Sequence, residues 1–259
     1  MIYLKHFTYS QNSINTYKSC PLKFKFKYID KINWRQDDIG SREYYESLVV
    51  GSEFHLLCER YFSNIPLGIN ENTNPKYIKW IEKIKRLLPL PNETLERGNE
   101  SLFPVYLPEY EIRYTVNGNT ITAKYDLIII KENAIEIWDW KTENKKVDYN
   151  NAQNRIQTIV YMFLAKEVIP KLHNIDMSYE DITMKYYQPE YEEEPVTISY
   201  SEEIHNSYKR RIIDYIDMMK KEKYHEVKNT NHCKYCEFNK LCNEQDVNYN
   251  ILEEENYEC

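Results

Sequence analysis

The chain has 259 residues, of which 42% are apolar and 29% charged, and it contains only 5 Gly and 10 Pro. This length allows one large or two small domains, and the composition excludes a minimal disulfide scaffold, a collagen-like repeat and a wholly disordered chain. The strongest apolar run, residues 127–130, is far too short to span a bilayer, and the first residues lack the apolar stretch of a signal peptide. We therefore expect a cytoplasmic (intracellular) protein without membrane association.

The net charge of -7 is unevenly distributed along the chain. Residues 243–259 carry six acids and no Lys or Arg, which leaves a net charge of -1 on the remainder. The first 35 residues carry seven Lys and Arg residues against Asp30 alone, interleaved with aromatic residues. This segment is either a groove that follows a nucleic-acid backbone and stacks its bases, or a solvated basic helix over core aromatic side chains.

Two short helices are expected near the N-terminus. Ser10 can cap a helix that runs to Lys18, and Pro21 is favourable at the first position of the next helix. Cys20 then falls at the junction between the two.

Two longer helices follow. Apolar residues at three- and four-residue spacing predict one helix over residues 43–61 and another from Asn74 to Leu88. His55 lies on the first of these, one turn after Gly51. A Gly inside a helix costs about 1 kcal/mol relative to Ala, which is easier to understand where another backbone or a ligand approaches closely.

The pattern then changes to that of β-strands. Residues 109–116, 120–130 and 134–141 are rich in Ile, Tyr, Val and Thr and are separated by turn residues, which predicts a three-stranded antiparallel meander. If Glu132 and Asn133 form a two-residue turn, the register of the second hairpin is fixed along its whole length.

This register places Asp126 directly opposite Asp139 on one face of the sheet. Opposed carboxylates repel unless a cation or proton lies between them, and the apolar neighbours imply a buried strand pair, where unpaired charge is costly. Because strand side chains alternate, Lys141 faces the same side as Asp139, whereas Trp140 faces away and leaves its carbonyl near the strand edge. The alternative is a surface ladder of charges with an internal salt bridge.

The remaining pattern is a helix over residues 149–168, a strand pair within 181–200 and a helix that begins at Ser201. Gln157 and Tyr161 are four residues apart and therefore lie on one face of their helix. Helices, meander, helix, hairpin and helix in this order indicate an α/β fold with a central mixed sheet flanked by helices.

These residues resemble the RecB-like branch of the PD-(D/E)xK nuclease superfamily over almost the whole chain. The matching motifs are Ser10-x2-Ser13-x3-Tyr17-x2-Cys20-Pro21, Gly51-x3-His55, Tyr125-Asp126-Leu127, Asp139-Trp140-Lys141-Thr142 and Gln157-x3-Tyr161. Their order and shared metal chemistry make the set specific, although Tyr125 stands where the superfamily motif has Pro.

The resemblance implies a restriction-endonuclease-like core within a single nuclease domain, residues 1–259. The expected parts are a helical N-terminal part (1–104), a catalytic core (105–200), a C-terminal helix with a cysteine cluster (201–242) and an acidic tail (243–259).

The resemblance also implies a metal-dependent catalytic site. Its expected metal ligands are His55, Asp126, Asp139 and the backbone carbonyl of Trp140, with Lys141 as the catalytic amine. The metal is expected to be Mn²⁺ or Mg²⁺, and an imidazole ligand favours Mn²⁺.

The resemblance assigns supporting roles to two further residues. Gln157 and Tyr161 would contact the substrate or hold the metal-binding loop, with core packing as the alternative for Tyr161. Glu111 has the same parity on the neighbouring strand, so it is either an outer-shell or second-metal ligand or an exposed strand residue.

Cysteine spacing provides a second motif. Cys233-x2-Cys236-x5-Cys242, together with Cys20, can close a tetrahedral four-sulfur site that joins the two ends of the chain. Sequence chemistry alone accepts zinc or an iron-sulfur cluster at such a site. The resemblance implies a structural [4Fe-4S] cluster, as in the CRISPR-associated adaptation exonucleases and the AddB nuclease domain. With Zn²⁺, His232 would be a substitute ligand.

We therefore expect a metal-dependent DNA nuclease, an exonuclease that acts on single-stranded DNA ends. No Gly-x4-Gly-Lys-Ser/Thr motif is present, so the enzyme is expected to work without an ATP motor of its own, alone or with protein partners in DNA repair or CRISPR adaptation. The alternatives are a catalytically silent DNA-binding or assembly subunit and a zinc-stapled interaction domain.

Overall fold

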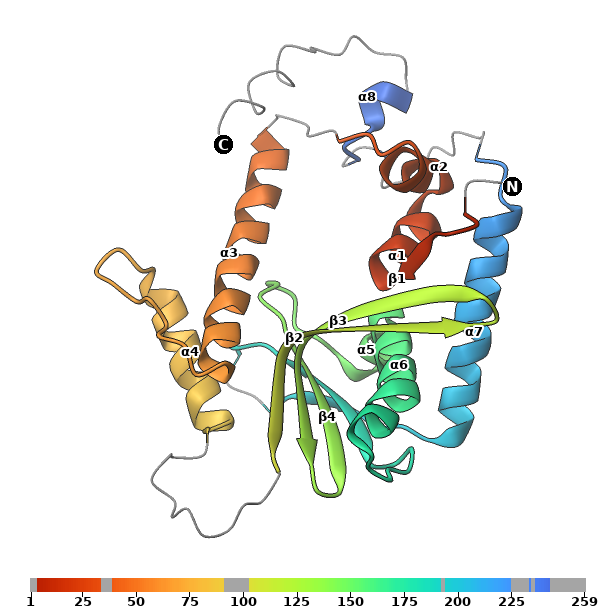
Figure 1. Cartoon of the computed structure of the whole chain (residues 1–259). Helices are drawn as coiled ribbons and strands as arrows, with labels where there is room; N and C mark the ends of the chain where they lie inside the picture. The colour runs from red at the N-terminus through yellow and green to blue at the C-terminus, as the bar shows by residue number, and fades with distance from the viewer. Residues whose placement is uncertain are drawn as a thin grey trace.

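The computed structural model describes residues 4–33, 39–90, 103–191, 194–224, 233 and 236–242, with the backbone alone for 39–47. A six-stranded mixed sheet lies at its centre with helices on both faces (Figure 1), which confirms the predicted α/β class. The acidic tail 243–259 and His232 lie outside the described residues.

The N-terminal segment folds largely as its sequence predicts. A short strand, β1 (Thr8–Ser10), leads into helices α1 (Gln11–Ser19) and α2 (Pro21–Phe24), and α2 continues as the π-helix η1 (Lys25–Ile29). The Oγ of Ser10 accepts a hydrogen bond from the Ser13 backbone N–H at 3.2 Å and so caps α1. Cys20 ends α1 and precedes α2, as expected.

Most of the described aromatic residues of this segment belong to the core. Phe24 is fully buried and its ring stacks on that of Tyr224, with 5.7 Å between centroids, and Tyr17 is 6% exposed. Of the two interpretations of the basic, aromatic segment, these residues support the helix packed over core aromatics. Trp34 and Arg35 lie outside the described residues.

The remaining strands form the sheet in the order β1-β3-β4-β5-β6, with β2 on the other edge of β3. Their bounds are β2 Val105–Val116, β3 Asn119–Lys131, β4 Ala134–Trp140, β5 Ile182–Tyr187 and β6 Val196–Ile198. The predicted antiparallel register between β3 and β4 is confirmed from Lys131 opposite Ala134 to Leu127 opposite Trp138. The sequence pattern missed β1, which is parallel to β3; β4 and β5 are also parallel to each other.

Strand β3 forks between two partners along one edge. Its residues 120–122 pair with β1 and its residues 127–131 pair with β4, so residues 123–126 pair with neither of these strands. On the opposite edge the ladder with β2 skips one position, Glu109 opposite Asp126. The fork therefore leaves Asp126 at a gap beside the end of β4.

Side-chain alternation changes at the same gap. Tyr125 and Ile128, an odd and an even position, both face the core on the α6 side, whereas Leu127 faces the core on the α3 side. A strictly alternating strand would put Tyr125 and Leu127 on the same face. The change coincides with Glu109, whose φ of 49° lies in the left-handed region.

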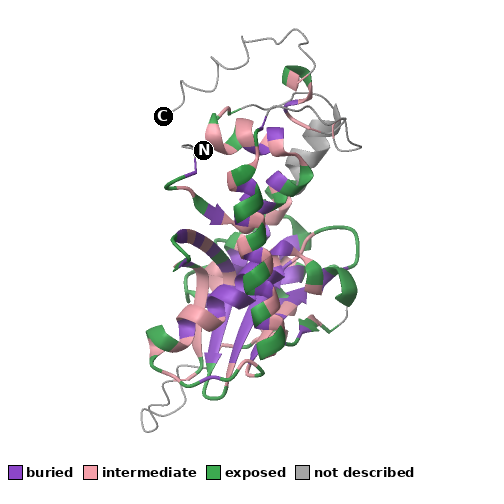
Figure 2. Ribbon diagram, turned by 90° about the vertical axis from the view of Figure 1, so that its right-hand side faces the viewer, coloured by how far each residue is buried: buried purple, intermediate pink, exposed green. Residues whose placement is uncertain are grey.

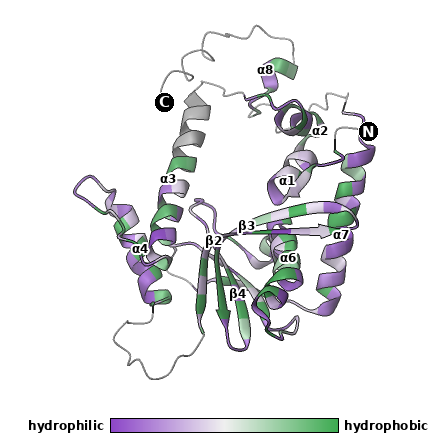
Figure 3. Ribbon diagram, viewed as in Figure 1, coloured by the Kyte–Doolittle hydropathy of each residue, from purple (hydrophilic) through white to green (hydrophobic). Residues whose placement is uncertain are grey.

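Helices cover the two faces of the sheet with separate apolar cores. On one side lie α5 (Tyr149–Asn154), α6 (Ile156–His173) and α7 (Glu202–Lys221); on the other lie α3 (Ile39–Phe62) and α4 (Pro75–Leu87) (Figure 1). The buried residues between these layers run along the strands (Figure 2), and the hydropathy colouring shows that the strands are largely apolar (Figure 3).

Two helices differ from their predicted bounds. The helix expected over residues 149–168 is interrupted at Arg155, whose extended backbone separates α5 from α6. Helix α3 begins four residues earlier than expected, at Ile39. The last described helix, α8 (Asn239–Cys242), lies beside α2 (Figure 1). Within the described residues, no helix combines the length and apolarity required to cross a membrane.

The packing of α4 gives a direct test of the α3-side core. Ile84 is fully buried there, whereas Lys85 points outward to an exposed ion pair with Glu82. We predict that Ile84→Ala lowers the free energy of unfolding by about 2–5 kcal/mol, because the cavity is only partly closed by relaxation. Lys85→Ala should change it by less than about 1 kcal/mol. Urea denaturation measures both values, and equal effects would contradict this packing.

Candidate metal centre

The predicted site residues meet at the fork of β3. His55 comes from α3, Asp126 from β3, and Asp139 from the end of β4, with Lys141 just beyond it. Gln157 reaches the same place from the first turn of α6. The centre is thus built from both faces of the sheet.

His55 contacts both β3 and β4. Its Nε2 lies 3.0 Å from the Trp140 carbonyl oxygen and its Nδ1 lies 3.3 Å from Asp126 Oδ1. Burial acts to lower the pKa of His55, but the carboxylates of Asp126 and Asp139 and the Trp140 carbonyl outweigh burial and raise that pKa. The imidazole is therefore held toward its charged form, in which both ring nitrogens are donors.

A close approach at Gly51 permits this position of α3. A Cβ atom at Gly51 would lie 3.3 Å from Thr142 Oγ1, just beyond the end of β4. A side chain at position 51 would therefore make an unusually tight contact with Thr142. The Gly one turn before His55 is therefore explained by packing, as its cost inside a helix suggested.

Asp126 does not pair directly with Asp139, contrary to the expected register. The β3–β4 ladder ends at Leu127 opposite Trp138, and Asp126 Oδ2 instead accepts a hydrogen bond from the Trp140 backbone N–H at 2.8 Å. The reason is that β3 changes its alternation at Asp126, so the ladder with β4 ends at Leu127, whereas β4 stays paired with β5 on its other edge, where Asp139 lies opposite Tyr186. The two acids remain close enough for the charge of Asp126 to affect the pKa of Asp139.

Asp139 is buried and held by two neighbours. Its Oδ2 lies 2.6 Å from Lys141 Nζ, and its Oδ1 accepts a hydrogen bond of 2.5 Å from Gln157 Nε2. Gln157 Oε1 in turn accepts a hydrogen bond from Lys141 Nζ at 3.0 Å. Burial, opposed by Lys141 and reinforced by Asp126, raises the pKa of Asp139 to about 6.

Tyr161 supports the centre through the backbone. Its hydroxyl donates a hydrogen bond to the Lys124 carbonyl at 2.6 Å, and its own carbonyl accepts one from the Tyr125 hydroxyl at 2.8 Å. The side chain is buried, and burial together with the charges of Asp139 and Asp126 raises its pKa. These contacts fix α6 against the residues that precede Asp126.

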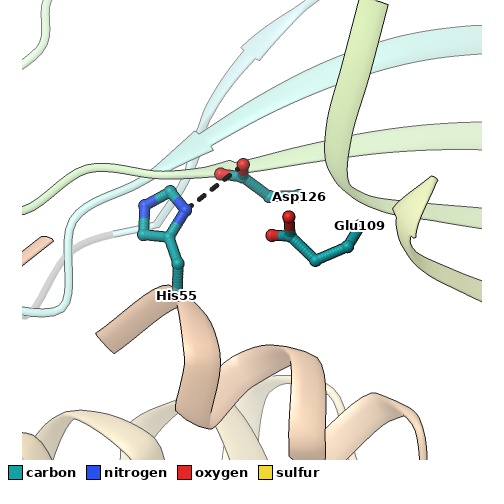
Figure 4. A group of neighbouring side chains, drawn as sticks. All are labelled: His55, Glu109 and Asp126. Carbon is teal, nitrogen blue, oxygen red and sulfur yellow. Dashed lines mark ion pairs between the residues drawn. The ribbon is translucent and has the colours of Figure 1, made fainter. Parts of the chain in front are cut away.

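The acid on β2 that adjoins the centre is Glu109 and not Glu111. Among the described residues, His55, Glu109 and Asp126 form a group whose ligand atoms all lie within 4.8 Å of one another (Figure 4). Glu111 instead pairs with Arg113 Nε at 2.8 Å on an exposed surface, and its hydrogen bonds to Arg113 and Thr122 lower its pKa.

Glu111 is an exposed strand residue, which was one of its two expected roles. It does not share the position of Glu109, because β2 also changes its alternation, at the left-handed Glu109. On one side of this residue Leu107 faces the α6-side core, and on the other side Tyr110 and Ile112 face the same core. The Pro108-Glu109 pair was the available sequence signal, since Pro in a strand often marks an irregular position.

The donor set fits a divalent cation. Imidazole, carboxylate and carbonyl donors are those that Mn²⁺ and Mg²⁺ accept. In addition, Asp139 Oδ2 is buried and accepts no well-formed hydrogen bond, despite its proximity to the Lys141 ammonium. A buried carboxylate oxygen with spare acceptor capacity is what a bound cation would satisfy.

The cysteine segment forms a second cluster. Cys20 Sγ accepts a hydrogen bond from the Lys23 backbone N–H, and the C-terminal segment is tied to α2 and η1 by the Lys23–Glu237 ion pair at 2.6 Å and by Phe26 against Phe238. Burial, with the charges of Cys236, Cys20 and Cys233, raises the pKa of Cys242 to about 11. The four predicted thiols therefore lie near one another. Cys58 is a buried thiol of α3, in the core on the α3 side of the sheet.

Comparison with known proteins decides the family. The family model described as PD-(D/E)XK nuclease superfamily matches residues 8–243. The chain belongs to this superfamily. The match includes the fork of β3 and the end of β4, where Asp139-Trp140-Lys141 forms the (D/E)XK pattern. A comparison with curated proteins gave no match.

Two solved structures resemble the chain. A "putative exonuclease" from Eubacterium rectale has a TM-score of 0.53 and 11% identity, over 93% of this chain and 89% of that one. The protein SSO0001 has a TM-score of 0.44 and 15% identity, over 93% and 87%. At this level of identity, the first similarity supports the fold that the superfamily match indicates.

The raised pKa of Asp139 predicts a pH-dependent stability effect. Folding favours the protonated acid, so this contribution to the free energy of unfolding is full at low pH and is lost as the pH rises through about 6. Asp139→Asn mimics the protonated acid and should stabilise the metal-free protein by about 1–3 kcal/mol at pH 7.5. The gain should shrink as the pH falls below about 6.

Urea denaturation in a chelator at pH 5 and 7.5 measures this effect. Asp148→Asn is a control with the opposite pH dependence. Hydrogen bonds from Asn151 lower the pKa of Asp148, so the contribution of this carboxylate to the free energy of unfolding is lost as the pH falls. A loss of stability in Asp139→Asn at pH 7.5 would contradict the interpretation.

Proposed function

We propose that the protein is a metal-dependent deoxyribonuclease that hydrolyses phosphodiester bonds of DNA. The observation that carries the proposal is the convergence of His55, Asp126 and Asp139 with the Trp140 carbonyl and the Lys141 ammonium. This set combines hard cation ligands with an amine, on a fold whose superfamily consists of nucleases.

In this proposal His55, Asp126, Asp139 and the Trp140 carbonyl hold Mn²⁺ or Mg²⁺. A divalent ion bound there would polarise the phosphodiester and supply a nucleophile near neutral pH. The carboxylates of Asp126 and Asp139 would balance the charge of the metal ion. To bind the ion, His55 must lose the proton that these neighbouring carboxylates stabilise. Metal affinity should therefore increase with pH.

Lys141 is the proposed catalytic amine. Its side chain is 20% exposed, so the ammonium at its end could reach a bound phosphate while the stem stays packed. Gln157 holds Lys141 and Asp139 together through its two amide atoms and so fixes the direction of the ammonium. A positive charge held in this way stabilises the negative charge that develops on the phosphate oxygens.

The proposed activity is exonucleolytic, on single-stranded DNA ends. Two observations support it: the resemblance to the RecB-like branch, and the description of a protein of similar fold as an exonuclease. Protein partners in DNA repair or CRISPR adaptation are part of the same proposal.

We predict that Lys141→Ala reduces cleavage of single-stranded DNA in Mn²⁺ or Mg²⁺ by about 10²-fold or more, because the negative charge that develops on the phosphate in the transition state loses a stabilising ammonium group. Lys145→Ala, an exposed position four residues later, should cleave like the unchanged protein. End-labelled DNA on denaturing gels measures both rates, and circular dichroism checks the fold.

The same assay tests the type of activity. An exonuclease degrades linear single strands and leaves circular ones intact, whereas an endonuclease cuts both. If Lys141→Ala cleaves DNA at the unchanged rate, the proposed catalytic role of Lys141 is wrong. An absence of metal-dependent cleavage in the unchanged protein would favour the silent-subunit alternative.

We further propose that Cys20, Cys233, Cys236 and Cys242 hold a structural [4Fe-4S] cluster. Burial raises the pKa of the Cys236 and Cys242 thiols, so a bound metal would be needed to hold them as thiolates near neutral pH. The charges of Cys20, Cys233 and Cys236 act on Cys242, which supports a shared site. The cluster would join the N-terminal helices to the C-terminal segment, beside the Lys23–Glu237 ion pair.

The choice of a [4Fe-4S] cluster over zinc rests on the resemblance to the RecB-like branch, because tetrahedral four-sulfur chemistry accepts either metal.

We predict that Cys20→Ala abolishes iron binding and lowers the melting temperature, because the joint between the chain ends is lost. Cys58→Ala should keep its iron, since Cys58 is buried in the α3-side core. Elemental analysis and visible absorption of anaerobically purified protein measure metal content. Zinc in place of iron would support the zinc-stapled alternative, and unchanged metal content in Cys20→Ala would contradict the assignment.

A further inference from the structure

We infer that Glu109 is an additional ligand of the divalent cation at the fork of β3. The inference rests on the proposed metal-dependent function and extends the ligand set beyond the residues that the sequence motifs supply. It concerns a β2 residue that lies outside the matching motifs.

The first support is geometric. The ligand atoms of His55, Glu109 and Asp126 lie within 4.8 Å of one another, and they come from three different elements. The side chains point toward a common space, with Glu109 approaching Asp126 from β2 (Figure 4). Adjacent ligands of an octahedral ion with metal–oxygen distances of about 2.1 Å are about 3 Å apart, so small side-chain movements would close the group.

The second support is the contrast with Glu111. Both acids lie on β2, two residues apart, and regular alternation would place them on one face. The left-handed backbone at Glu109 interrupts the ladder opposite Asp126 and separates the two. Glu109 is 21% exposed and lies at the centre, whereas Glu111 is 45% exposed and pairs with Arg113.

The third support is that the counter-ion of Glu109 can be displaced. Lys124 Nζ lies 2.6 Å from Glu109 Oε2, and the Lys124 side chain is 61% exposed. An exposed ion pair of this kind holds its partners weakly. In the metal-free protein Lys124 neutralises Glu109, and a divalent cation would take over that role.

Manganese affinity of the full-length protein tests the inference. Glu109→Gln keeps the shape of the side chain but removes its charge, and we expect it to weaken Mn²⁺ binding by about 10-fold or more. Glu111→Gln is the matched control, with an expected change below about twofold. Electron paramagnetic resonance of free Mn²⁺ and isothermal titration calorimetry give the dissociation constants without reference to activity.

A third variant separates ligation from a structural role of the Glu109–Lys124 pair. If Glu109 is a ligand, Lys124→Met removes a competitor, so Mn²⁺ should bind at least as tightly as in the unchanged protein. If the pair merely shapes the strand, Lys124→Met should weaken binding as much as Glu109→Gln does. That result, or equal affinities for Glu109→Gln and Glu111→Gln, would overturn the inference.

The outcomes also distinguish this inference from the proposed function. Asp126→Asn should abolish both Mn²⁺ binding and DNA cleavage. If the unchanged protein neither binds Mn²⁺ nor cleaves DNA, the proposed function and the role of Glu109 fall together. If it does both and Glu109→Gln binds Mn²⁺ with unchanged affinity, the role of Glu109 alone is wrong.

Discussion

The candidate site depends on a gap in hydrogen bonding at the middle of β3. Between its pairing with β1 and its pairing with β4, this strand has a short stretch bound to neither, and the ladder with β2 skips the same position. Buried backbone groups normally find partners, and here the Asp126 carboxylate provides one by accepting the Trp140 N–H. That bond joins the fork to the end of β4, just beyond the last pair of the β3–β4 ladder.

The fork concentrates negative charge at a poorly solvated point. Asp126 on β3 lies close to Asp139 on β4, and Glu109 on β2 adds a third carboxylate. Lys141, His55 and Lys124 lie against these acids, and Asp139 Oδ2 is a buried oxygen that accepts no well-formed hydrogen bond. An arrangement that stabilises the fold less than it could is common at functional sites, where a ligand supplies the missing interaction.

The layers around the sheet give each contributing element its place. Helix α3 approaches the end of β4 through Gly51, and α6 is fixed through Tyr161 and Gln157 from the opposite face. The cysteine segment lies away from the sheet against α2, so a cluster there would act on stability and on the N-terminal helices, without contact with the fork. The two proposed metal sites are therefore separable by mutation.

The sequence by itself determined the local features. Ser10, Asn74 and Ser201 cap the helices as their side chains predict, and the Glu132-Asn133 turn fixes the β3–β4 register, because each depends on residues close in the chain. The motif residues also identified the superfamily that the family model confirms.

Tertiary structure alone decided which groups adjoin the metal position. Regular alternation favoured Glu111 and a direct Asp126–Asp139 pair, but one left-handed residue shifted the faces of β2 and β3 and brought Glu109 to the site. The approach of His55 and the meeting of Cys20 with the C-terminal thiols were likewise set by packing between distant elements. Conformational preferences of residues determine the structure of segments that are continuous in the chain. The distance between segments remote in the chain depends on how the helices pack against the faces of the sheet.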